Sequence, residues 1–355
     1  MSFKITIDSN KESFPTESEE TILESALKHG HSFPYGCRNG ACGSCKGKLI
    51  EGKIHYQNEV TGISEQESKE GYALFCQAIP DSDVTIEAQE VAQVREIAIR
   101  KLPCRVTEIE QLSHDVIRLF LKLPKSERLQ FLAGQYIDLL LREGKKRSFS
   151  LANAPHNDDY LELHIRHYDG GLFSEYAFHE LKESTLLRFE GPLGTFFLRE
   201  DSERPMIMVA GGTGFAPIKG VIEHALHLGD KRPIHFYWGA REEEDLYLNQ
   251  LAQTWANEHD HIQYTPVLSE LEDGDKWQGR TGFVHEAILE DIKDVSDYEV
   301  YTCGPPPMVH AVLDSFVERG LSTEFIYSDS FEFATSLLTS SNFLHHKYGN
   351  KQFFI

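Results

Sequence analysis

Six cysteines occur in the 355 residues, and four of them have a spacing that suits redox chemistry. Cys37, Cys42 and Cys45 form a C-x4-C-x2-C group, and Cys76 follows alone. Three clustered thiolates and one distant thiolate are the pattern that ligates a [2Fe–2S] cluster. Glycines within this stretch permit left-handed backbone conformations, so that N–H groups can point at the sulfur atoms. We therefore predict these four cysteines as metal ligands.

Two other uses of four cysteines fit less well. A structural zinc site has two short cysteine pairs separated by a spacer, whereas here three cysteines cluster and one is remote. Disulfides are disfavoured because the sequence opens with a strand-like alternation, Phe3 to Ile7, and not with a secretory signal. A one-electron centre needs a source of electrons, and the remainder of the chain has to supply it.

Composition limits the possible functions. A chain of this length is expected to contain two or three domains. Its hydrophobic content of 40% and charged content of 26% are those of a globular protein. A net charge of −21 argues against nucleic acid or an anionic membrane as a partner, and no apolar run is long enough to span a membrane. We expect a cytoplasmic protein with local basic pockets for cofactor phosphates.

Residues 1–92 are expected to form a small α+β domain around the cysteines. Apolar residues alternate in 3–7 and 46–50, which predicts strands, and residues 18–30 carry them at helical spacing. Residues 84–86 close the unit as a last strand. This order resembles a plant-type ferredoxin domain with all four ligand positions present. Its 15 acidic against 8 basic residues form either a solvated surface or a docking face for a basic partner, and both remain open.

A charged linker at residues 90–101 precedes a change of pattern. Between residues 100 and 200, short alternating segments are separated by turn residues, which predicts an antiparallel β-barrel. Cys104 is expected to pack in its core. The predicted strands span 104–109, 116–121, 135–141, 160–165 and 186–189.

The first of two polar segments in this barrel runs from Arg147 through Ser148 to Ser150. Arg147 has the planar guanidinium that suits a phosphate. The ring of Phe149 can cover a flat cofactor, and the Ser150 hydroxyl can hydrogen-bond a ring nitrogen. An ordinary exposed strand end would have a similar sequence, so this segment alone does not establish a site.

The second polar segment contains His164 and Arg166 and leads into a glycine turn. Gly171 precedes a predicted helix whose N-terminus, capped by Ser174, would receive a pyrophosphate. We count these four residues, like those of the first segment, among the candidate cofactor contacts.

Residues 203–333 are expected to form a doubly wound parallel sheet. The apolar run 206–210 predicts a buried strand, and the loop after it leads into a helix. Strand, glycine loop and helix bring N–H groups up to a dinucleotide phosphate. Strands and helices then alternate to residue 328, as in α/β folds. The candidate contacts in the loop are Gly211, Gly212, Thr213, Gly214 and Pro217.

Two further segments complete the expected nucleotide site. Cys303, Gly304 and Pro305 come directly after a predicted strand. Arg241 follows the second strand of the sheet, where a Rossmann-like fold contacts the adenosine ribose. Because four carboxylates follow it at 242–245, a 2′-phosphate would be repelled, and we expect NADH rather than NADPH.

These motifs together resemble the ferredoxin–NADP reductase superfamily. R-S-F-S and G-L-F-S match its flavin motifs R-x-[YF]-S and G-x-x-S, and C-G-P-P-P-M matches its nicotinamide motif C-G-P-x-x-M. The resemblance implies that Arg147, Phe149 and Ser150 contact the flavin and that residues 171–174 hold the second phosphate of FAD. It places Cys303 beside the nicotinamide, so that Ser150 and Cys303 are the expected catalytic residues. Further implied contacts are Gly304 beside the nicotinamide, and Thr213 and Pro217 across the pyrophosphate.

Residues 1–333 as a whole resemble the iron–sulfur flavoprotein reductases in which the ferredoxin domain comes first. This group contains the reductase components of aromatic-ring dioxygenases and the CDP-6-deoxy-3,4-glucoseen reductase of deoxysugar synthesis. The resemblance implies that hydride electrons from NAD(P)H pass through FAD to the [2Fe–2S] cluster and then singly to a dehydrase or oxygenase partner. A stand-alone flavin or quinone reductase and a redox-sensing binding protein are the alternatives.

The C-terminus departs from this pattern. Members of the group commonly stop soon after an aromatic segment, here Phe331 to Phe333, whereas this chain continues through residues 334–355. This Ser/Thr-rich tail has no clear period, and we expect it to be poorly ordered. The extension leaves open whether Phe331 or Phe333 stacks on the flavin.

Overall fold

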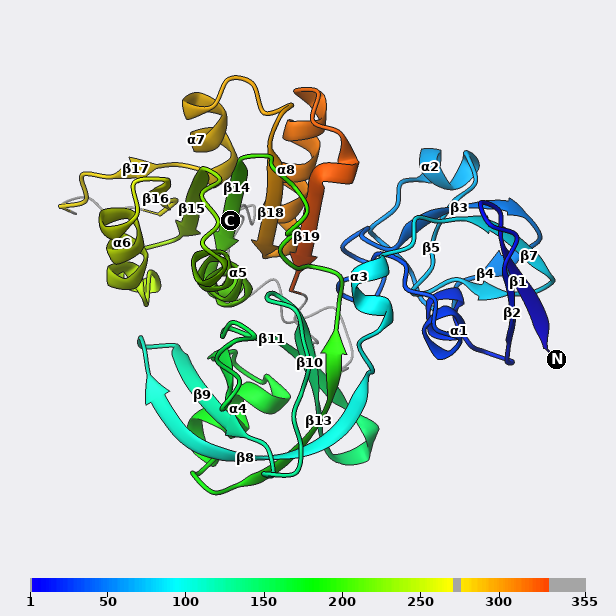
Figure 1. The fold of residues 1–355 in the computed structure, drawn as a ribbon, viewed down its shortest axis with the longest axis horizontal. Coiled ribbons are helices and arrows are strands. Elements are labelled where there is room, and N and C mark those ends of the chain that lie inside the picture. Colours follow the sequence, from blue (N-terminus) through cyan, green and yellow to red (C-terminus); the bar gives the residue numbers. More distant parts are fainter. Residues whose placement is uncertain (1, 271–275, 332–355) are drawn as a thin grey trace, which may run out of the picture.

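A computed structural model describes residues 2–270 and 276–331. Three units, each built on its own sheet, follow one another along the chain (Figure 1). The N-terminal unit lies beside the junction of the other two, and the barrel lies below the parallel sheet in that view. The predicted fold class, α+β followed by an antiparallel barrel and an α/β parallel sheet, is confirmed.

The N-terminal unit is a five-stranded sheet covered by one helix. Helix α1 (Ile22–Lys28) begins after Thr21, whose side chain accepts from the Glu24 N–H while Glu24 accepts from the Thr21 N–H, a capping box. It buries apolar side chains against the sheet. The sheet order is β2 (Ser13–Thr16), β1 (Phe3–Ile7), β7 (Val84–Glu87), β3 (Lys46–Glu51) and β5 (Tyr72–Leu74), with the small pair β4 (Ile54–His55) and β6 (Ile79–Pro80) and helix α2 (Glu65–Lys69) outside it.

The second unit is the antiparallel barrel. Alternating side chains of its strands point inward and form one core. A bridge between Leu151 and Leu163 brings the two edge strands together. The strand order is β11 (Lys146–Ser150), β10 (Tyr136–Leu140), β13 (Leu186–Leu193), β8 (Arg100–Gln111), β9 (Val116–Lys122) and β12 (Leu161–Arg166), and helix α4 (Leu172–His179) follows β12.

Two details of this unit differ from expectation. The segment predicted as a linker contains a short helix, α3 (Ala92–Arg95), held by burial of Val94, and strand β8 already begins at Arg100. The predicted capping role of Ser174 is wrong. Gly171 is the N-cap of α4, and Ser174 lies in the first turn, where its hydroxyl folds back to the main chain of Tyr168.

The third unit is a six-stranded sheet in which all described neighbours are parallel. Helices α5 (Phe215–Leu228) and α6 (Asn249–Glu258) pack on one face, and α7 (Val284–Asp291) and α8 (Pro306–Glu318) on the other. Phe215 stacks on Trp238 with ring centroids 4.1 Å apart. The strand order is β17 (Arg280–Thr281), β16 (Ile262–Leu268), β15 (Ile234–Ala240), β14 (Met206–Gly211), β18 (Glu299–Gly304) and β19 (Ile326–Ser330), with 3₁₀ turns at Gly212–Gly214, Glu243–Asp245 and Thr323–Phe325. A further 3₁₀ turn, Arg142–Gly144, joins β10 to β11 in the barrel.

The predicted tail, residues 334–355, and Phe333 lie outside the described residues. Phe331 is described, and its N–H donates to the Gly304 carbonyl at 3.0 Å. Its ring packs against the core of the third unit. Within the described ranges, no helix combines the length and apolar character needed to cross a membrane.

Candidate redox site

The four predicted metal ligands converge around one loop. Residues 38, 40 and 43 have φ values of 61°, 85° and 76°, so the loop turns through left-handed positions. The Cys42 N–H points at Cys37 Sγ at 3.4 Å. The Cys42 thiol, followed by the N–H groups of Asn39, Cys42 and Ala41, outweighs burial and lowers the pKa of Cys37 to about 5.

This donor set fits an iron–sulfur cluster. All six cysteines, each within the described residues, are free thiols, and Cys42, Cys45 and Cys76 are buried. Backbone N–H groups around Cys37 stabilise a thiolate, which is the form that binds iron. A disulfide would need two of these sulfurs bonded, and none is.

The loop is fixed to the barrel by main-chain atoms next to Cys37. The Tyr35 N–H donates to Thr195 Oγ1 at 2.8 Å, and the Thr195 N–H donates to the Tyr35 carbonyl at 3.0 Å. The buried hydroxyl of Tyr136 on β10 donates to the Gly36 carbonyl at 3.0 Å. The position of Cys37 is therefore set by strands of the barrel.

The other side of the loop rests on the third unit. Ser44 Oγ donates to the Ser328 carbonyl of β19 at 3.2 Å. His310 Nε2 of α8 donates to the Ala41 carbonyl at 3.2 Å. A side chain on Gly36 would come within 3.2 Å of Asp329 Oδ1, so glycine lets the loop approach β19 closely. The cluster loop thus lies where all three units meet.

Asp329 connects the candidate residues of all three units, and the sequence-based prediction missed it. In the parallel pairing of β18 and β19 it lies beside Cys303. Ser150 Oγ donates to Asp329 Oδ2 at 3.5 Å. Burial, followed by the neighbouring Cys37, raises the pKa of this carboxyl to about 7. An acid at the carboxyl end of a parallel strand, where ligands bind in such sheets, would have been the sequence signal.

The first polar segment forms strand β11. Ser150 at its end is buried, whereas Arg147 is half-buried and, within the described residues, donates to the neighbouring Lys146 carbonyl at 2.7 Å. The half-buried Phe149 ring lies 5.4 Å from the ring of Phe173. A half-buried guanidinium and a half-buried aromatic ring thus lie on the same strand as a buried hydroxyl, a combination that fits a flat, phosphorylated cofactor.

The second polar segment brackets a tight glycine turn. A side chain on Gly171 would come within 2.3 Å of Ser174 Oγ, so glycine is required where α4 begins. The first N–H groups of α4 have no partner within the helix, which suits a phosphate. The Ser174 hydroxyl accepts from the Tyr168 N–H at 3.2 Å and fixes this turn.

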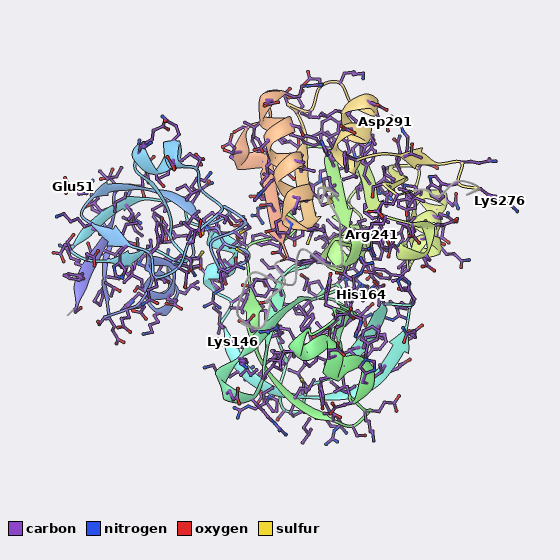
Figure 2. The ribbon with its side chains drawn as sticks, turned by 180° about the vertical axis from the view of Figure 1, so that it is seen from behind. Glu51, Lys146, His164, Arg241, Lys276 and Asp291 are labelled. Atoms are coloured by element: carbon purple, nitrogen blue, oxygen red, sulfur yellow. The ribbon has the colours of Figure 1, made fainter. Side chains whose placement is uncertain are left out.

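His164 and Arg166 link the barrel to the third unit. Both ring nitrogens of His164 have protein partners: Tyr247 Oη at 3.0 Å and Glu162 Oε1 at 2.9 Å. Arg166 donates to Asp245 Oδ1 at 2.5 Å, and its Nη1 lies next to Gly212. Figure 2 shows His164 at the edge of the barrel, with Arg241 of the third unit above it.

The two predicted nucleotide motifs pack backbone to backbone. A side chain on Gly214 would come within 2.0 Å of the Cys303 carbonyl. Gly304 has φ of 154°, and a side chain there would come within 3.0 Å of Gly211 Cα. Glycine is therefore required at these positions for the loop after β14 to lie against the end of β18.

The remaining candidate residues surround this contact. The Gly212 carbonyl accepts from Trp238 Nε1 at 3.1 Å, and half-buried Thr213 follows it in the loop. Pro217 is buried in α5. Arg241 Nε lies 3.4 Å from Asp245 Oδ2. Pro305 is the N-cap of α8 and packs near Gly211.

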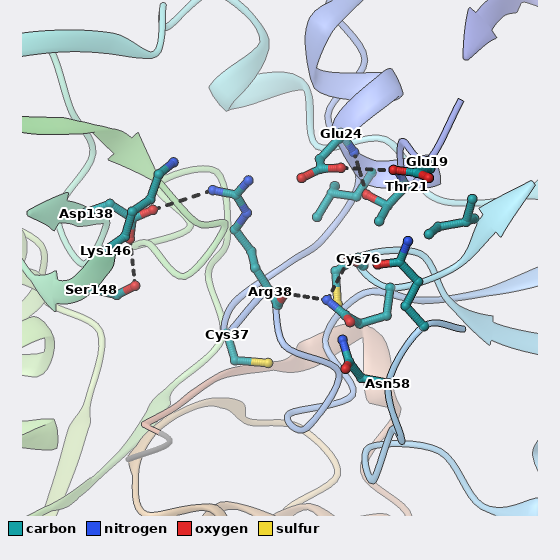
Figure 3. A pocket seen from close by; sticks show the side chains of 14 residues that line it. Glu19, Thr21, Glu24, Cys37, Arg38, Asn58, Cys76, Asp138, Lys146 and Ser148 are labelled. Carbon is teal, nitrogen blue, oxygen red and sulfur yellow. Dashed lines mark hydrogen bonds and ion pairs between the residues drawn. The ribbon is translucent and has the colours of Figure 1, made fainter. Parts of the chain in front are cut away.

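A polar pocket of about 440 Å³ opens between the N-terminal unit and the barrel beside Cys37 and Cys76 (Figure 3). Arg38 extends across it toward Asp138, with Nη1 and Oδ2 3.6 Å apart. Ser148 Oγ donates to the same carboxylate at 2.6 Å. The pocket connects the cysteine loop with the strand that carries the first polar segment.

Family models match each unit. Residues 5–81 match a 2Fe-2S iron-sulfur cluster binding domain, residues 103–198 an oxidoreductase FAD-binding domain, and residues 208–314 an oxidoreductase NAD-binding domain. The three cofactors predicted from the sequence, a [2Fe–2S] cluster, FAD and a nicotinamide dinucleotide, are thereby confirmed.

Known proteins match almost the whole chain. The CDP-6-deoxy-L-threo-D-glycero-4-hexulose-3-dehydrase reductase of Yersinia pestis is 40% identical over 331 residues, which are 93% of this chain and 99% of the relative. Reductase component 1 of terephthalate 1,2-dioxygenase from Comamonas is 34% identical over 333 residues, 93% of this chain and 98% of the relative. The crystal structure of the Amycolatopsis cytochrome P450 reductase GcoB has a TM-score of 0.75 at 33% identity, over 93% of this chain and 98% of that one.

The geometry and these relatives agree. A cysteine loop is fixed between a flavin barrel and a nucleotide-binding sheet, and the relatives with this arrangement are reductases and reductase components. The chain therefore belongs to the iron–sulfur flavoprotein reductases, which pass electrons from NAD(P)H through FAD and a [2Fe–2S] cluster to a partner protein.

Proposed function

We propose that the partner is a deoxysugar dehydrase that acts on a nucleotide-linked 4-hexulose, and that this chain supplies it with single electrons from NADH. The 40% identity to the Yersinia pestis dehydrase reductase, over 99% of that protein, supports this acceptor most directly. The oxygenase-linked relative is 34% identical over a similar span, so an oxygenase component is the second candidate.

The proposed catalytic residues are Ser150 and Cys303. Bound FAD takes up two electrons together and releases them one at a time, the chemistry that NAD(P)H and the cluster respectively require. Asp329 accepts the Ser150 hydrogen bond and lies beside Cys303 in the sheet. It fixes the orientation of the Ser150 hydroxyl, whose oxygen could then accept a hydrogen bond from bound flavin, and burial of all three side chains would keep water from the hydride path.

The proposed cofactor contacts divide into two groups. Arg147, Ser148, Phe149 and Ser150 hold the flavin and its phosphate, and the turn from Gly171 to Ser174 holds the second phosphate. The loop Gly211–Gly214, with Pro217 and with Cys303 to Pro305, holds the nicotinamide dinucleotide. Because both nitrogens of His164 are engaged by Glu162 and Tyr247, we assign His164 to the domain interface. Arg166, near Gly212, faces the pyrophosphate side.

A preference for NADH follows from the charges around Arg241. Its guanidinium lies beside the Asp245 carboxylate, and three more acids precede that aspartate. A 2′-phosphate would meet this negative charge, whereas a 2′-hydroxyl would not. We accordingly expect a higher kcat/KM with NADH than with NADPH. The proposed domain limits are 1–92, 100–200 and 203–333.

The acceptor is tested with purified components. The reductase is mixed with NADH and either a deoxysugar dehydrase with its CDP-linked hexulose or the oxygenase component of terephthalate dioxygenase with its substrate. We expect NADH oxidation to couple to product formation with the dehydrase, and Cys42→Ser to abolish the coupling. Faster coupled turnover with the oxygenase would contradict the proposed partner. Equal rates with free flavin or quinone and no coupling to either enzyme would favour a stand-alone reductase.

A further inference from the structure

A cluster of two histidines and one glutamate, none of them assigned to a cofactor, lies beside the proposed phosphate turn, where β12 leads into α4. His167 directly follows β12, and Glu175 and His179 are four residues apart on one face of α4. His167 Nε2 lies 3.5 Å from Glu175 Oε2, and His179 Nε2 lies 3.3 Å from the same oxygen. The three ligand atoms all lie within 4.8 Å of one another.

These separations are those of a tetrahedral metal site. Zinc binds histidine nitrogen and carboxylate oxygen at about 2.0–2.2 Å, so two ligands at a tetrahedral angle lie about 3.3 Å apart. Both Nε2 atoms lie at about this distance from Oε2. Two histidines and one glutamate leave a fourth position for water, a ligand set that zinc uses in proteins.

Further features of this cluster favour the binding of a cation. Among the described residues, the buried Nε2 atom of His167 has no partner in hydrogen-bond geometry, although Glu175 Oε2 lies only 3.5 Å away. The Gly170 N–H donates to Glu175 Oε1 at 3.0 Å, which orients the carboxylate and leaves Oε2 toward the histidines. The His167 ring is also held by Phe178, with centroids 4.9 Å apart.

Two other groups of possible ligands in the described residues fit a cation less well. In the group of His114, Asp115 and Asp245, the guanidinium of Arg166 already lies against both aspartates. The group of Glu12, His31 and Glu90 contains one histidine, and the Nδ1 atom of His31 already has Glu90 as its hydrogen-bond partner at 2.9 Å.

We propose that His167, Glu175 and His179 form a binding site for Zn²⁺ or a similar divalent transition metal, with water as the fourth ligand. The metal joins the end of β12 to α4 and closes the loop 168–171 between them. This site is separate from the cysteine loop and needs neither NADH nor a partner protein.

The test measures zinc directly. Holoprotein with FAD and the cluster in place is dialysed against micromolar zinc chloride, and bound zinc is quantified by elemental analysis. Intact cluster ligands cannot take up the added metal. We expect one equivalent of zinc per chain in the wild type and its loss in His179→Ala and Glu175→Gln. Glu175→Gln keeps a side-chain carbonyl that can accept from the Gly170 N–H and so retains the local fold. It therefore tests the site even if His179→Ala misfolds and does not incorporate FAD.

His227→Ala is the matched control because His227 is also exposed on a last helical turn and stacks on His156 at 3.7 Å. We expect it to keep the full equivalent. The proposal is overturned if wild-type holoprotein binds no zinc above the buffer blank, or if His227→Ala loses the metal while His179→Ala retains it. Retention by Glu175→Gln with an unchanged dissociation constant would likewise remove the carboxylate from the site.

Discussion

The barrel meets its two neighbours through interfaces of different chemistry. The interface with the nucleotide-binding sheet contains buried charges. Glu162 on β12 of the barrel accepts from Lys219 on α5 of the third unit at 3.1 Å, and His164 of the barrel lies between Glu162 and Tyr247. Toward the cysteine loop the barrel presents Tyr136 and Thr195, which bind main-chain atoms. Buried paired charges dominate the first interface, whereas at the second the neutral hydrogen bonds are buried and the Arg38–Asp138 pair is longer, 3.6 Å, and more exposed.

The difference matches the reactions that cross the two interfaces. Hydride transfer needs the reacting atoms about 3–3.5 Å apart and aligned, so the two domains that hold nicotinamide and flavin must keep a fixed orientation. A buried charge network with each member paired provides one orientation, because any displacement leaves a charge unpaired. Transfer of a single electron to the cluster needs proximity without bond formation, and neutral hydrogen bonds suffice.

The largest expected effect separates the two reactions. Cys42→Ser removes one of the four proposed cluster ligands, so we expect reduction of cytochrome c by NADH to be lost while reduction of ferricyanide by the flavin persists. Both activities are measured with the same FAD-loaded preparation. Survival of both at wild-type rates would place the cluster outside the electron path.

The charge network around Glu162 is tested with Lys219→Met. Methionine is an unbranched side chain of similar length, but it lacks the ammonium group. Glu162 would then lack one of its partners in a buried site, and we expect a loss of about 3–5 kcal/mol in the free energy of unfolding. Thermal unfolding measures it, together with slower flavin reduction by NADH in stopped-flow experiments.

Glu223→Gln is the control for that variant. It neutralises the Glu223 carboxylate, which lies 3.0 Å from the same Lys219 ammonium. The Glu223 side chain is more exposed than that of Glu162. A loss of about 1 kcal/mol or less is expected. Equal losses in the two variants would show that the buried position of Glu162 is unimportant.

A pH dependence follows from the same network. Burial opposes ionisation of Glu162, but the His164 hydrogen bond and the Lys219 charge lower its pKa to about 2. Because the folded value lies below that of an unfolded glutamate, about 4.3, this stabilisation is complete above that pH and is lost as the pH falls toward 2. Wild-type melting temperature should therefore fall more steeply below pH 4.3 than that of Glu162→Gln. Parallel curves would contradict the assignment.

An effect smaller than that of Lys219→Met is expected at the cysteine loop. Thr195→Val removes the hydroxyl that accepts from Tyr35 but leaves the main-chain bond between the same residues, a change of about 1–2 kcal/mol in docking. We expect slower reduction of cytochrome c with unchanged ferricyanide reduction. A fall in both would place Thr195 in the hydride reaction instead.

The sequence predicted those parts that depend on local pattern. The cysteine spacing, the glycines at 211 and 214 and the strand periods all reflect contacts close along the chain or a fixed backbone requirement. Helix α2 was missed because it buries no side chain, although Ser64 and Glu67 form the capping box that signals its start. The prediction that Ser174 caps α4 was wrong, because its hydroxyl bonds to the main chain of Tyr168 in the turn before the helix.

The remainder depends on how the domains dock. Asp329 meets Ser150 across 179 residues, and His164 meets Tyr247 across 83. No periodicity or spacing encodes such pairs, since the two members of each pair come from different domains. The candidate residues were therefore predictable as separate motifs. The place of Asp329 near the end of a predicted strand was also visible in the sequence, but its contact with Ser150 was not.

The main-chain bonds at Tyr35 and Gly36 have a consequence for evolution. Because the barrel binds the carbonyl and N–H groups of these residues, much of the docking does not depend on which side chains the N-terminal domain displays elsewhere. Its outer surface is free to change with the acceptor while the internal contact is retained. An N-terminal domain exchanged between relatives with different partners should therefore still dock on the barrel. Such a chimera is expected to acquire the partner specificity of the donor without changes at the interface.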